Sequence, residues 1–350
     1  MVRLAIIGTG NMANAHAQAF AAIEDCEVVA CSDIVPGRAR EFADKYGIAS
    51  AYEVNEEMLD SEKLDGVSVV TPDVSHIGPV LSVCERNIHV MCEKPLASNL
   101  ADAKTMVEAA SSRGLLTAVN FSYRNSSASQ KAAEMVASGA VGRVIHVEGA
   151  YLQCWIASKV WGDWRTTEAF LWRMSTRHGS LGVLGDVGVH LYDLVSFVAG
   201  DIGDISCDLR AFEKDLMRKD DYVFDANESM AANVRFAGGG LGTLHSSRWA
   251  VGHGNTVSLS VYGDKGAIDL NLDRPAPETL RACIGENMDK LAWENVECEE
   301  TPNMYRRFVE SIRDGVQGQT SFAGGAKVQA YLDASMKSAE GGCYVRTGVA

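Results

Sequence analysis

The chain has 350 residues, of which 47% are hydrophobic and 22% charged, with only 7 prolines. This length corresponds to about two domains of roughly 150 residues, and the composition excludes a disordered or collagen-like chain. The formal net charge of −14 opposes binding to nucleic acid or to an anionic membrane surface. We therefore expect a soluble globular protein with neither nucleic acid nor a membrane as partner.

The nine cysteines are scattered and form no Cys-x-x-Cys pair, which argues against a disulfide framework and against a zinc knuckle. Several lie within apolar runs, as small buried thiols do. Free thiols suit a reducing compartment, so we expect a cytoplasmic location. The sequence contains no apolar stretch of the roughly 18 residues that a membrane span needs, and the N-terminal apolar segment is too short for a signal peptide.

Apolar strands and helices alternate along the first third of the chain. Residues 2–7 (VRLAII) predict a short strand, and an alanine-rich helical pattern follows over 12–23. Four more apolar runs predict strands, at 26–33, 64–72, 89–95 and 116–121, and the segments between them have helical patterns, at 36–47, 74–87 and 99–114. This alternation predicts an α/β fold that begins with a parallel sheet covered on both faces, a Rossmann dinucleotide-binding domain over 1–121.

The pattern changes after about residue 122. A helical segment at 130–139 precedes a longer strand at 144–153, a tryptophan-rich loop and a helix that begins near Gly185. Strand-like runs without intervening helices then follow to about residue 272, separated by glycine or Gly-Asp turns, and two helical segments at 303–315 and 325–340 end the pattern. We predict a C-terminal α+β domain over 122–350 with an open, mostly antiparallel sheet.

The first predicted strand runs into a glycine-rich turn, GTGNMA. Gly8 allows a tight turn, Gly10 lets the backbone approach a pyrophosphate, and small Ala13 lets the next helix pack closely on the strand. The diphosphate would lie at the positive N-terminus of that helix. Asp33, twenty residues after Ala13, can bind the adenine-ribose hydroxyls. This carboxylate favours NAD, while the nearby Arg38 leaves NADP open.

A second motif, Glu93-Lys94-Pro95, follows the carboxyl end of a predicted parallel strand, where ligands bind in such sheets. An ammonium in a partly dry cleft beside a nicotinamide can exchange a proton with a substrate hydroxyl. The alternative is a solvated lysine at a strand end.

A third motif, GDVGVHLYD, places Asp186, His190 and Asp193 on one face of a predicted helix. A carboxylate one turn before an imidazole can orient it for acid/base work. The alternatives are a purely structural pair or a zinc site, and hydride transfer with a lysine available requires no metal.

Four of the six tryptophans lie in the loop over 151–173, at Trp155, Trp161, Trp164 and Trp172. Their flat faces suit stacking on sugars, and Arg165, Arg173 and Arg177 could hold hydroxyls or an anionic substituent. Core packing or a subunit contact explains the same residues equally well.

The chain resembles the glucose–fructose oxidoreductase, inositol dehydrogenase and rhizopine-catabolism family (Gfo/Idh/MocA). The resemblance rests on GTGNMA, VVTPDVSH, CEKPLA, GDVGVHLYD, VYGDKGAIDL and YRRFVESIRDG, which follow in this order along nearly the whole chain. It implies a Rossmann domain, a substrate-binding and oligomerisation domain whose open sheet often forms subunit interfaces, and a nicotinamide cofactor. We accordingly expect a homodimer or homotetramer assembled through the C-terminal sheet.

Together the motifs and the resemblance predict the site residues. The catalytic residues are Lys94, Asp186 and His190. The cofactor contacts are Gly8, Thr9, Gly10, Asn11, Met12, Ala13, Asp33, Arg38, Thr71, Pro72, His76, Glu93, Lys94, Asn120, Trp172 and Arg173. The substrate contacts are Lys94, Arg124, Trp161, Arg165, Asp186 and His190, and no metal is predicted. Two departures from the family pattern leave the substrate open: Ser180-Leu181-Gly182 replaces a common triple glycine, and a proline that often follows the Arg124 position is absent.

The resemblance implies an NAD-dependent or NADP-dependent oxidoreductase that transfers a hydride between nicotinamide and a secondary alcohol or ketone of a sugar, sugar derivative or cyclic polyol. Two alternatives remain open at this point. One is a redox glycoside hydrolase with tightly held NAD, and the other is a regulator of the same fold that binds the nucleotide without catalysis.

Overall fold

The computed structural model describes residues 1–273 and 276–349. The chain divides into two compact units, and each is described by itself. The first contains Met1–Phe121 and Pro302–Gln329, and the second contains Ser122–Thr301 and the C-terminal segment from Ala330 onward.

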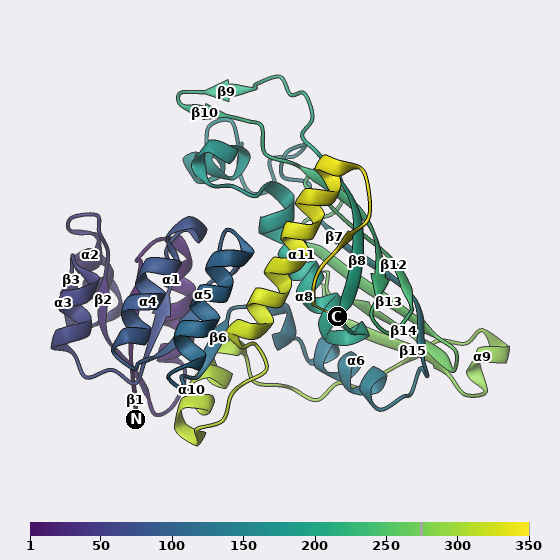
Figure 1. Cartoon of the computed structure of the whole chain (residues 1–350), viewed down its shortest axis with the longest axis horizontal. Helices are drawn as coiled ribbons and strands as arrows, with labels where there is room; N and C mark the ends of the chain where they lie inside the picture. The colour runs from purple at the N-terminus through teal and green to yellow at the C-terminus, as the bar shows by residue number, and fades with distance from the viewer. Residues whose placement is uncertain (274–275, 350) are drawn as a thin grey trace. The chain divides into compact units, whose positions relative to one another are not determined.

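The first unit is built on a parallel six-stranded sheet with the order β3-β2-β1-β4-β5-β6. Figure 1 labels β1, β2, β3 and β6 of this sheet. Its strands are β1 (Val2–Ile7), β2 (Cys26–Ser32), β3 (Ser50–Tyr52), β4 (Gly66–Val69), β5 (His89–Cys92) and β6 (Thr117–Val119). Its helices include α1 (Asn11–Ala21), α2 (Arg38–Tyr46), α3 (Asn55–Ser61), α4 (Ile77–Glu85), α5 (Leu100–Ser111) and α10 (Met304–Asp314). β1 and the middle of the sheet are almost completely buried, because helices cover both faces. The predicted parallel Rossmann sheet is therefore confirmed.

Two features of this unit were not predicted from the sequence pattern. β3 and α3 are short, with 3 and 7 residues, and neither shows a full hydrophobic period. α10 belongs to this unit because its Met304, Phe308 and Val309 pack in one core cluster with Leu4 and Phe20. The sequence signals the helix but not the sheet on which it packs.

The second unit is built on a nine-stranded sheet with the order β16-β15-β14-β13-β7-β12-β11-β8-β17. The strands that form its centre are β7 (Val144–Leu152), β8 (Ile202–Arg210), β11 (Ser229–Phe236), β12 (Leu241–Ser247), β13 (Thr256–Gly263), β14 (Gly266–Asn271) and β15 (Thr279–Ile284). Short edge strands complete it, β16 (Glu294–Asn295) and β17 (Val345–Arg346). β12 and β7 pair in parallel, and the other pairs are antiparallel. The predicted open, mostly antiparallel sheet is confirmed.

One face of this sheet packs against helix α8 (Val189–Ala199). Gly149 on β7 makes the close approach possible, because a Cβ there would lie 3.2 Å from Leu191 and 3.3 Å from Val195. Along β11 and β12, buried side chains alternate with exposed ones, as expected for a sheet with one covered face. The other helices with substantial length in this part are α6 (Ser127–Ala137) and α11 (Phe322–Gly341), and the division between the two units falls within α11.

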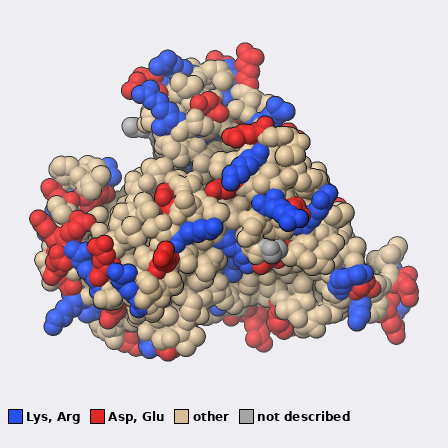
Figure 2. All heavy atoms as spheres, in the orientation of Figure 1, with Lys and Arg blue, Asp and Glu red and all other residues tan. Residues whose placement is uncertain are grey.

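Charge is interspersed on the surface: on the face drawn in Figure 2, basic side chains lie among acidic ones. Among the described residues, no helix combines the length and the apolar character needed to cross a membrane.

Candidate active site

The turn between β1 and α1 has the geometry of a phosphate-binding loop. Gly8 has a φ of +89°, and a Cβ there would lie 2.9 Å from the carbonyl carbon and oxygen of Val70, so only glycine fits. A Cβ at Gly10 would meet nothing within 4 Å, so the space beside this residue is open. Gly10 is the N-cap of α1, and this helix end presents its free N–H groups beside the open space. The turn therefore offers an anion site to a dinucleotide.

Asp33 follows β2 and is held by groups from the glycine turn. The backbone N–H and the hydroxyl of Thr9 donate to its Oδ2 at 2.8 and 2.9 Å, and the N–H of Val35 donates to Oδ1 at 2.9 Å. Arg38 Nη1 lies 3.4 Å from Oδ2. Burial raises the pKa of Asp33, but these hydrogen bonds and the arginine outweigh it and leave the pKa below its usual value. A fixed carboxylate at this position can accept hydrogen bonds from ribose hydroxyls.

Two polar atoms at the carboxyl ends of β4 and β6 are buried without a partner among the described residues. They are the hydroxyl of Thr71, which stands two residues after β4, and Oδ1 of Asn120, the residue after β6. Buried polar atoms normally have hydrogen-bond partners, and this edge of a doubly wound sheet is where dinucleotides bind. These atoms and the glycine turn fit a nicotinamide dinucleotide. Asn11 and Met12 lie exposed on the first turn of α1, and Pro72 directly follows Thr71.

Glu93, directly after β5, is buried in a polar network. Its Oε1 lies 2.7 Å from His16 Nε2 and accepts a bond of 2.6 Å from Asn120 Nδ2, while its Oε2 accepts from the N–H of Lys94 at 3.2 Å. Burial raises the pKa of Glu93, but the hydrogen bonds and the positive charges of His16 and Lys94 outweigh it and lower the pKa to about 2. An ionised carboxylate thus lies beside Lys94, whose side chain is half-buried.

His76 is completely buried and faces backbone carbonyl groups. Its Nε2 lies 2.9 Å from the carbonyl oxygen of Thr71, and its Nδ1 lies 3.0 Å from that of Pro95 and 3.2 Å from that of Leu96. The ring thus joins the segments after β4 and β5. A direct contact between His76 and a cofactor stays a prediction.

In the second unit, the predicted helix near Gly185 begins as a π-helical turn over Leu184–Gly188, which continues into α8. π-Helical turns occur frequently at functional sites. The turn carries Asp186, whose Oδ2 accepts a hydrogen bond of 2.9 Å from Arg248 Nη2, and Arg173 Nε lies 3.9 Å from the same oxygen. Arg248 is fully buried and also donates to the carbonyl oxygens of Arg173 and Gly182. A guanidinium thus fixes the carboxylate of Asp186 and the loop before it.

His190, on the first turn of α8, lies among aromatic rings. Its ring centroid is 5.2 Å from that of Tyr123 and 6.3 Å from that of Tyr151. The Tyr123 hydroxyl donates to the Tyr151 hydroxyl at 2.8 Å, and Tyr151 donates to Asn255 Oδ1 at 2.7 Å. Burial and the neighbouring tyrosine hold the pKa of Tyr151 well above its usual value, so its hydroxyl acts as a neutral hydrogen-bonding group.

Arg124, a predicted substrate contact, directs its guanidinium to Asp193. Nε and Nη2 donate to the two carboxylate oxygens at 2.9 and 2.6 Å, and both side chains are buried. The guanidinium also lies 4.6 Å from the ring centroid of Phe197. Asp193, which shares the predicted helix face with His190, therefore forms an ion pair with Arg124, and the substrate contact of Arg124 stays a prediction.

The tryptophan-rich loop separates into buried and exposed rings. Trp155 and Trp164 are 2% and 1% exposed and belong to a core cluster, whereas Trp161 is 44% exposed. Arg165 pairs with Asp215 and lies over the Trp164 ring, at 4.6 Å from its centroid. Core packing thus explains the two buried rings.

Trp172 and Arg173 form a cation–π pair, with the guanidinium 4.7 Å from the ring centroid. Sugar or cofactor contacts of Trp161, Arg165, Trp172 and Arg173 stay predictions. Within the described ranges, no group of three or more His, Cys, Asp or Glu side chains could hold a metal ion.

Sequence reasoning missed five residues of these networks: His16, Arg248, Tyr123, Tyr151 and Asn255. A signal existed for the first two. His16 lies in the buried stripe of α1 with Ala13 and Ala17, and Arg248 continues the inward alternation of β12. A polar residue at an inward position needs a buried partner, but the sequence does not reveal which one.

The strand order, the glycine turn and the fixed Asp33 define a dinucleotide-binding Rossmann protein with a second domain built on an open sheet. Comparison with protein families gives the assignment. Residues 2–121 match the oxidoreductase family with an NAD-binding Rossmann fold (Gfo/Idh/MocA), and residues 129–269 match the C-terminal domain of the same family. The chain therefore belongs to the Gfo/Idh/MocA oxidoreductases, and the predicted family, enzyme class and NAD-type cofactor are confirmed.

Proteins similar to this chain include named sugar dehydrogenases. Levoglucosan dehydrogenase of Pseudarthrobacter phenanthrenivorans is 25% identical over 78% of this chain and 74% of its own length. D-Glucoside 3-dehydrogenase of Escherichia coli is 29% identical over 77% of each chain. Among solved structures, a levoglucosan dehydrogenase in complex with NADH superposes with a TM-score of 0.88, at 24% identity and with 99% of both chains covered.

Proposed function

We propose that this protein is an NAD(P)-dependent oxidoreductase that transfers a hydride between nicotinamide and a secondary alcohol or ketone of a sugar, sugar derivative or cyclic polyol. The observation that carries the proposal is the position of Lys94, beside an ionised Glu93 at the carboxyl end of a strand in the dinucleotide-binding sheet. The family and the sugar substrates in the names of its relatives support the substrate class.

Oxidation of a secondary alcohol removes a hydride from carbon and a proton from oxygen. When bound, NAD(P) supplies the nicotinamide ring that takes the hydride. Lys94 polarises the substrate oxygen, and His190 accepts its proton. Asp186, fixed by Arg248, stabilises the resulting imidazolium. The proposal requires the amine of Lys94 and the imidazole of His190 to act on the same oxygen.

Asp33 is the basis for proposing NAD as the preferred cofactor. A carboxylate held by Thr9 accepts the ribose hydroxyls and repels the 2′-phosphate of NADP. Arg38 is 47% exposed and forms only a long contact with Asp33, so it can turn toward a 2′-phosphate, and we retain NADP as a second cofactor.

The remaining proposed contacts follow the family positions. For the cofactor we retain the turn from Gly8 to Ala13, together with Thr71, Pro72, His76, Glu93, Asn120, Trp172 and Arg173. For the substrate we retain Arg124, Trp161 and Arg165, besides the three catalytic residues. Trp161 is the best placed of these for a sugar face, because a large part of its ring is exposed.

The test is a screen of aldoses, inositols, sugar acids and aryl glycosides with NAD and with NADP, in which reduced cofactor and released aglycone are both measured. The proposal predicts stoichiometric NADH formation with at least one polyol or sugar and loss of turnover in Lys94→Ala with NADH binding retained. Aglycone release without accumulation of NADH would instead identify a redox glycosidase. Binding of NADH without turnover of any compound would identify a nucleotide-responsive regulator. Turnover by Lys94→Ala at the rate of the unchanged enzyme would refute the catalytic assignment.

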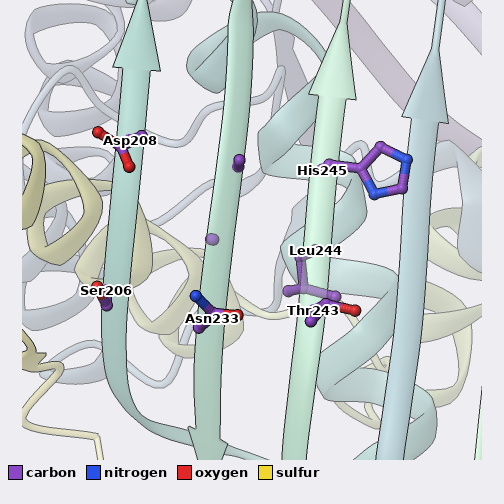
Figure 3. Close-up of a pocket in the computed structure, with 8 residues that line it drawn as sticks. Ser206, Asp208, Asn233, Thr243, Leu244 and His245 are labelled. Carbon is purple, nitrogen blue, oxygen red and sulfur yellow. The ribbon is translucent and has the colours of Figure 1, made fainter.

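We also propose that the protein forms a homodimer or homotetramer through the open face of the second sheet. Figure 3 shows Asp208, Asn233, Thr243 and His245 on neighbouring strands of this sheet, and they alternate with buried residues. The face forms a hollow of about 370 Å³ lined by polar and apolar side chains, and the same open face on a second copy could pack against it. Sedimentation of the wild type beside a Thr243→Arg variant tests this, since a monomeric wild type would refute it. The nine free cysteines support a location in the reducing cytoplasm.

A further inference from the structure

Two buried histidines hold the short segment that carries Lys94. His16, from α1, lies 2.7 Å from Oε1 of Glu93, the residue before Lys94. His76, just before α4, lies 3.0 Å from the carbonyl oxygen of Pro95, the residue after Lys94. Both imidazoles are 0% exposed. The lysine is thus held on both sides through its neighbours.

The contacts of His16 leave its ring a single orientation. On one side its Nδ1 lies 2.8 Å from Ser68 Oγ on β4, and on the other its Nε2 faces Glu93. Tyr305 of α10 covers the ring edge-on, with centroids 4.8 Å apart, and its hydroxyl accepts from Asn120 Nδ2 at 3.0 Å. Because Asn120 also bonds the same oxygen of Glu93, two donors fix Oε1 and leave Oε2 for the N–H of Lys94.

The contacts of His76 join two segments of the chain. Its Nδ1 faces the carbonyl oxygen of Pro95, and its Nε2 faces that of Thr71 at 2.9 Å. The ring therefore ties the end of β4 to the segment after β5.

Burial of these histidines and of Glu93 in a Rossmann core costs free energy. The buried stripe of α1 contains Ala13, Ala17 and Phe20 besides His16, and an apolar residue at position 16 would suit the same helix face. Burial of an imidazole and a carboxylate requires complete hydrogen bonding, and replacement of such groups by apolar ones is often neutral or stabilising. A structural role alone gives no reason for two such histidines around one lysine.

We propose that His16 and His76 are positioning residues for Lys94: they fix the backbone from Glu93 to Pro95 and thereby hold the amine at the substrate oxygen. This inference rests on the proposed function of Lys94. A displacement of about 1 Å in a reacting group can lower the rate by a factor on the order of 100. The two histidines therefore affect the rate of the chemical step through the position of Lys94.

The experiment compares His16→Leu, His16→Gln, His76→Leu and His76→Gln with a matched control, His89→Gln. His89 lies in the same unit, is partly buried and accepts a bond of 3.1 Å from the N–H of Leu116, away from the Lys94 segment. The primary readout is hydrogen exchange of the Lys94 amide in the NADH complex, resolved by mass spectrometry and compared with peptides from α2 and α3. The second readout is kcat and KM with the best substrate of the screen.

We expect each leucine variant to raise exchange at Lys94 at least 10-fold while the distant peptides are unchanged, and to lower kcat about 100-fold with KM for substrate within 3-fold. His16→Gln keeps an N–H that can donate to Glu93, so it should recover most of kcat. Unchanged exchange at Lys94, or a rise spread equally over the unit and matched by His89→Gln, would overturn the positioning role. If a leucine variant does not fold, the alanine variant at the same position takes its place under the same criteria.

Different results would refute the proposed function and the positioning role. Full turnover by Lys94→Ala refutes the catalytic lysine, whereas raised exchange at Lys94 without any loss of kcat refutes only the link between position and rate.

Discussion

The ion pair between Arg124 and Asp193 allows a substrate contact to be distinguished from a structural one. The hydrogen bonds of the pair include contacts of 2.9 and 2.6 Å, and the side chains are 8% and 1% exposed. Asp193→Asn keeps the shape of the side chain but leaves the guanidinium buried opposite a neutral amide. Loss of one partner of a buried pair costs about 3 to 5 kcal/mol.

This cost converts to a measurable change in Tm. The second unit contains about 200 residues, for which 1 kcal/mol corresponds to roughly 2 to 4 °C. Asp193→Asn should therefore lower the Tm of this unit by roughly 6 to 20 °C, as measured by differential scanning calorimetry with and without NADH. The double variant Arg124→Met/Asp193→Leu should recover most of the loss, because apolar groups of similar volume replace the pair.

A double-mutant cycle on the same two residues gives the coupling energy directly. A purely structural pair predicts a coupling of several kcal/mol and a KM for substrate that changes little at temperatures where the variants remain folded, whereas the proposed substrate contact of Arg124 predicts a raised KM in the Arg124 variants. If Asp193→Asn leaves Tm unchanged and raises KM instead, the guanidinium serves the substrate and the reasoning from burial is refuted.

Other predictions concern single sites. Gly8→Ala should reduce NADH affinity at least 10-fold in a fluorescence titration, because φ is +89° and the new Cβ would lie 2.9 Å from the Val70 carbonyl, and unchanged affinity would contradict the assigned turn. The pKa of Glu93 is lowered to about 2 from an ordinary 4.5. Its contribution to the free energy of unfolding is therefore complete above pH 4.5 and is lost as the pH falls through 2. In urea unfolding, Glu93→Gln should thus lower the free energy of unfolding by about 3 kcal/mol at pH 7 and by progressively less toward pH 2. A difference between wild type and variant that does not depend on pH would refute the ionised state of Glu93. Cys343 is exposed, whereas burial raises the pKa of Cys26 to about 12, so maleimide at pH 7 should label Cys343 first, and labelling of Cys26 at the same rate would contradict the fold.

Much of the fold could be predicted because its signals are local. The strand at Val2–Ile7, the turn at Gly8 and the strand that leads to Glu93 all depend on neighbouring residues, and each lies where the sequence pattern predicts it. β3 and α3 were missed because they are too short for a hydrophobic period to register. The π-helical turn before α8 was also missed, since helical periodicity does not distinguish i+4 from i+5 bonding over 5 residues.

The candidate site was less predictable because its networks join distant parts of the sequence. His16, Glu93, Asn120 and Tyr305 meet in one buried cluster, although up to 185 residues separate two bonded partners. Arg248 reaches Asp186 across 62 residues. A motif indicates which residues carry chemistry, but the groups that set their charge and orientation are determined by packing.

The central claim is that a sugar or polyol gives its hydride to NAD while Lys94 polarises the substrate oxygen. Transfer of a label tests it most directly. A substrate from the screen, deuterated at the oxidised carbon, is incubated with NAD and the enzyme. The mass of the reduced cofactor is then measured by mass spectrometry. We predict that the NADH carries one deuterium with the wild type and that Lys94→Ala forms none above background. Unlabelled NADH, or labelled NADH formed equally fast by Lys94→Ala, would contradict the account.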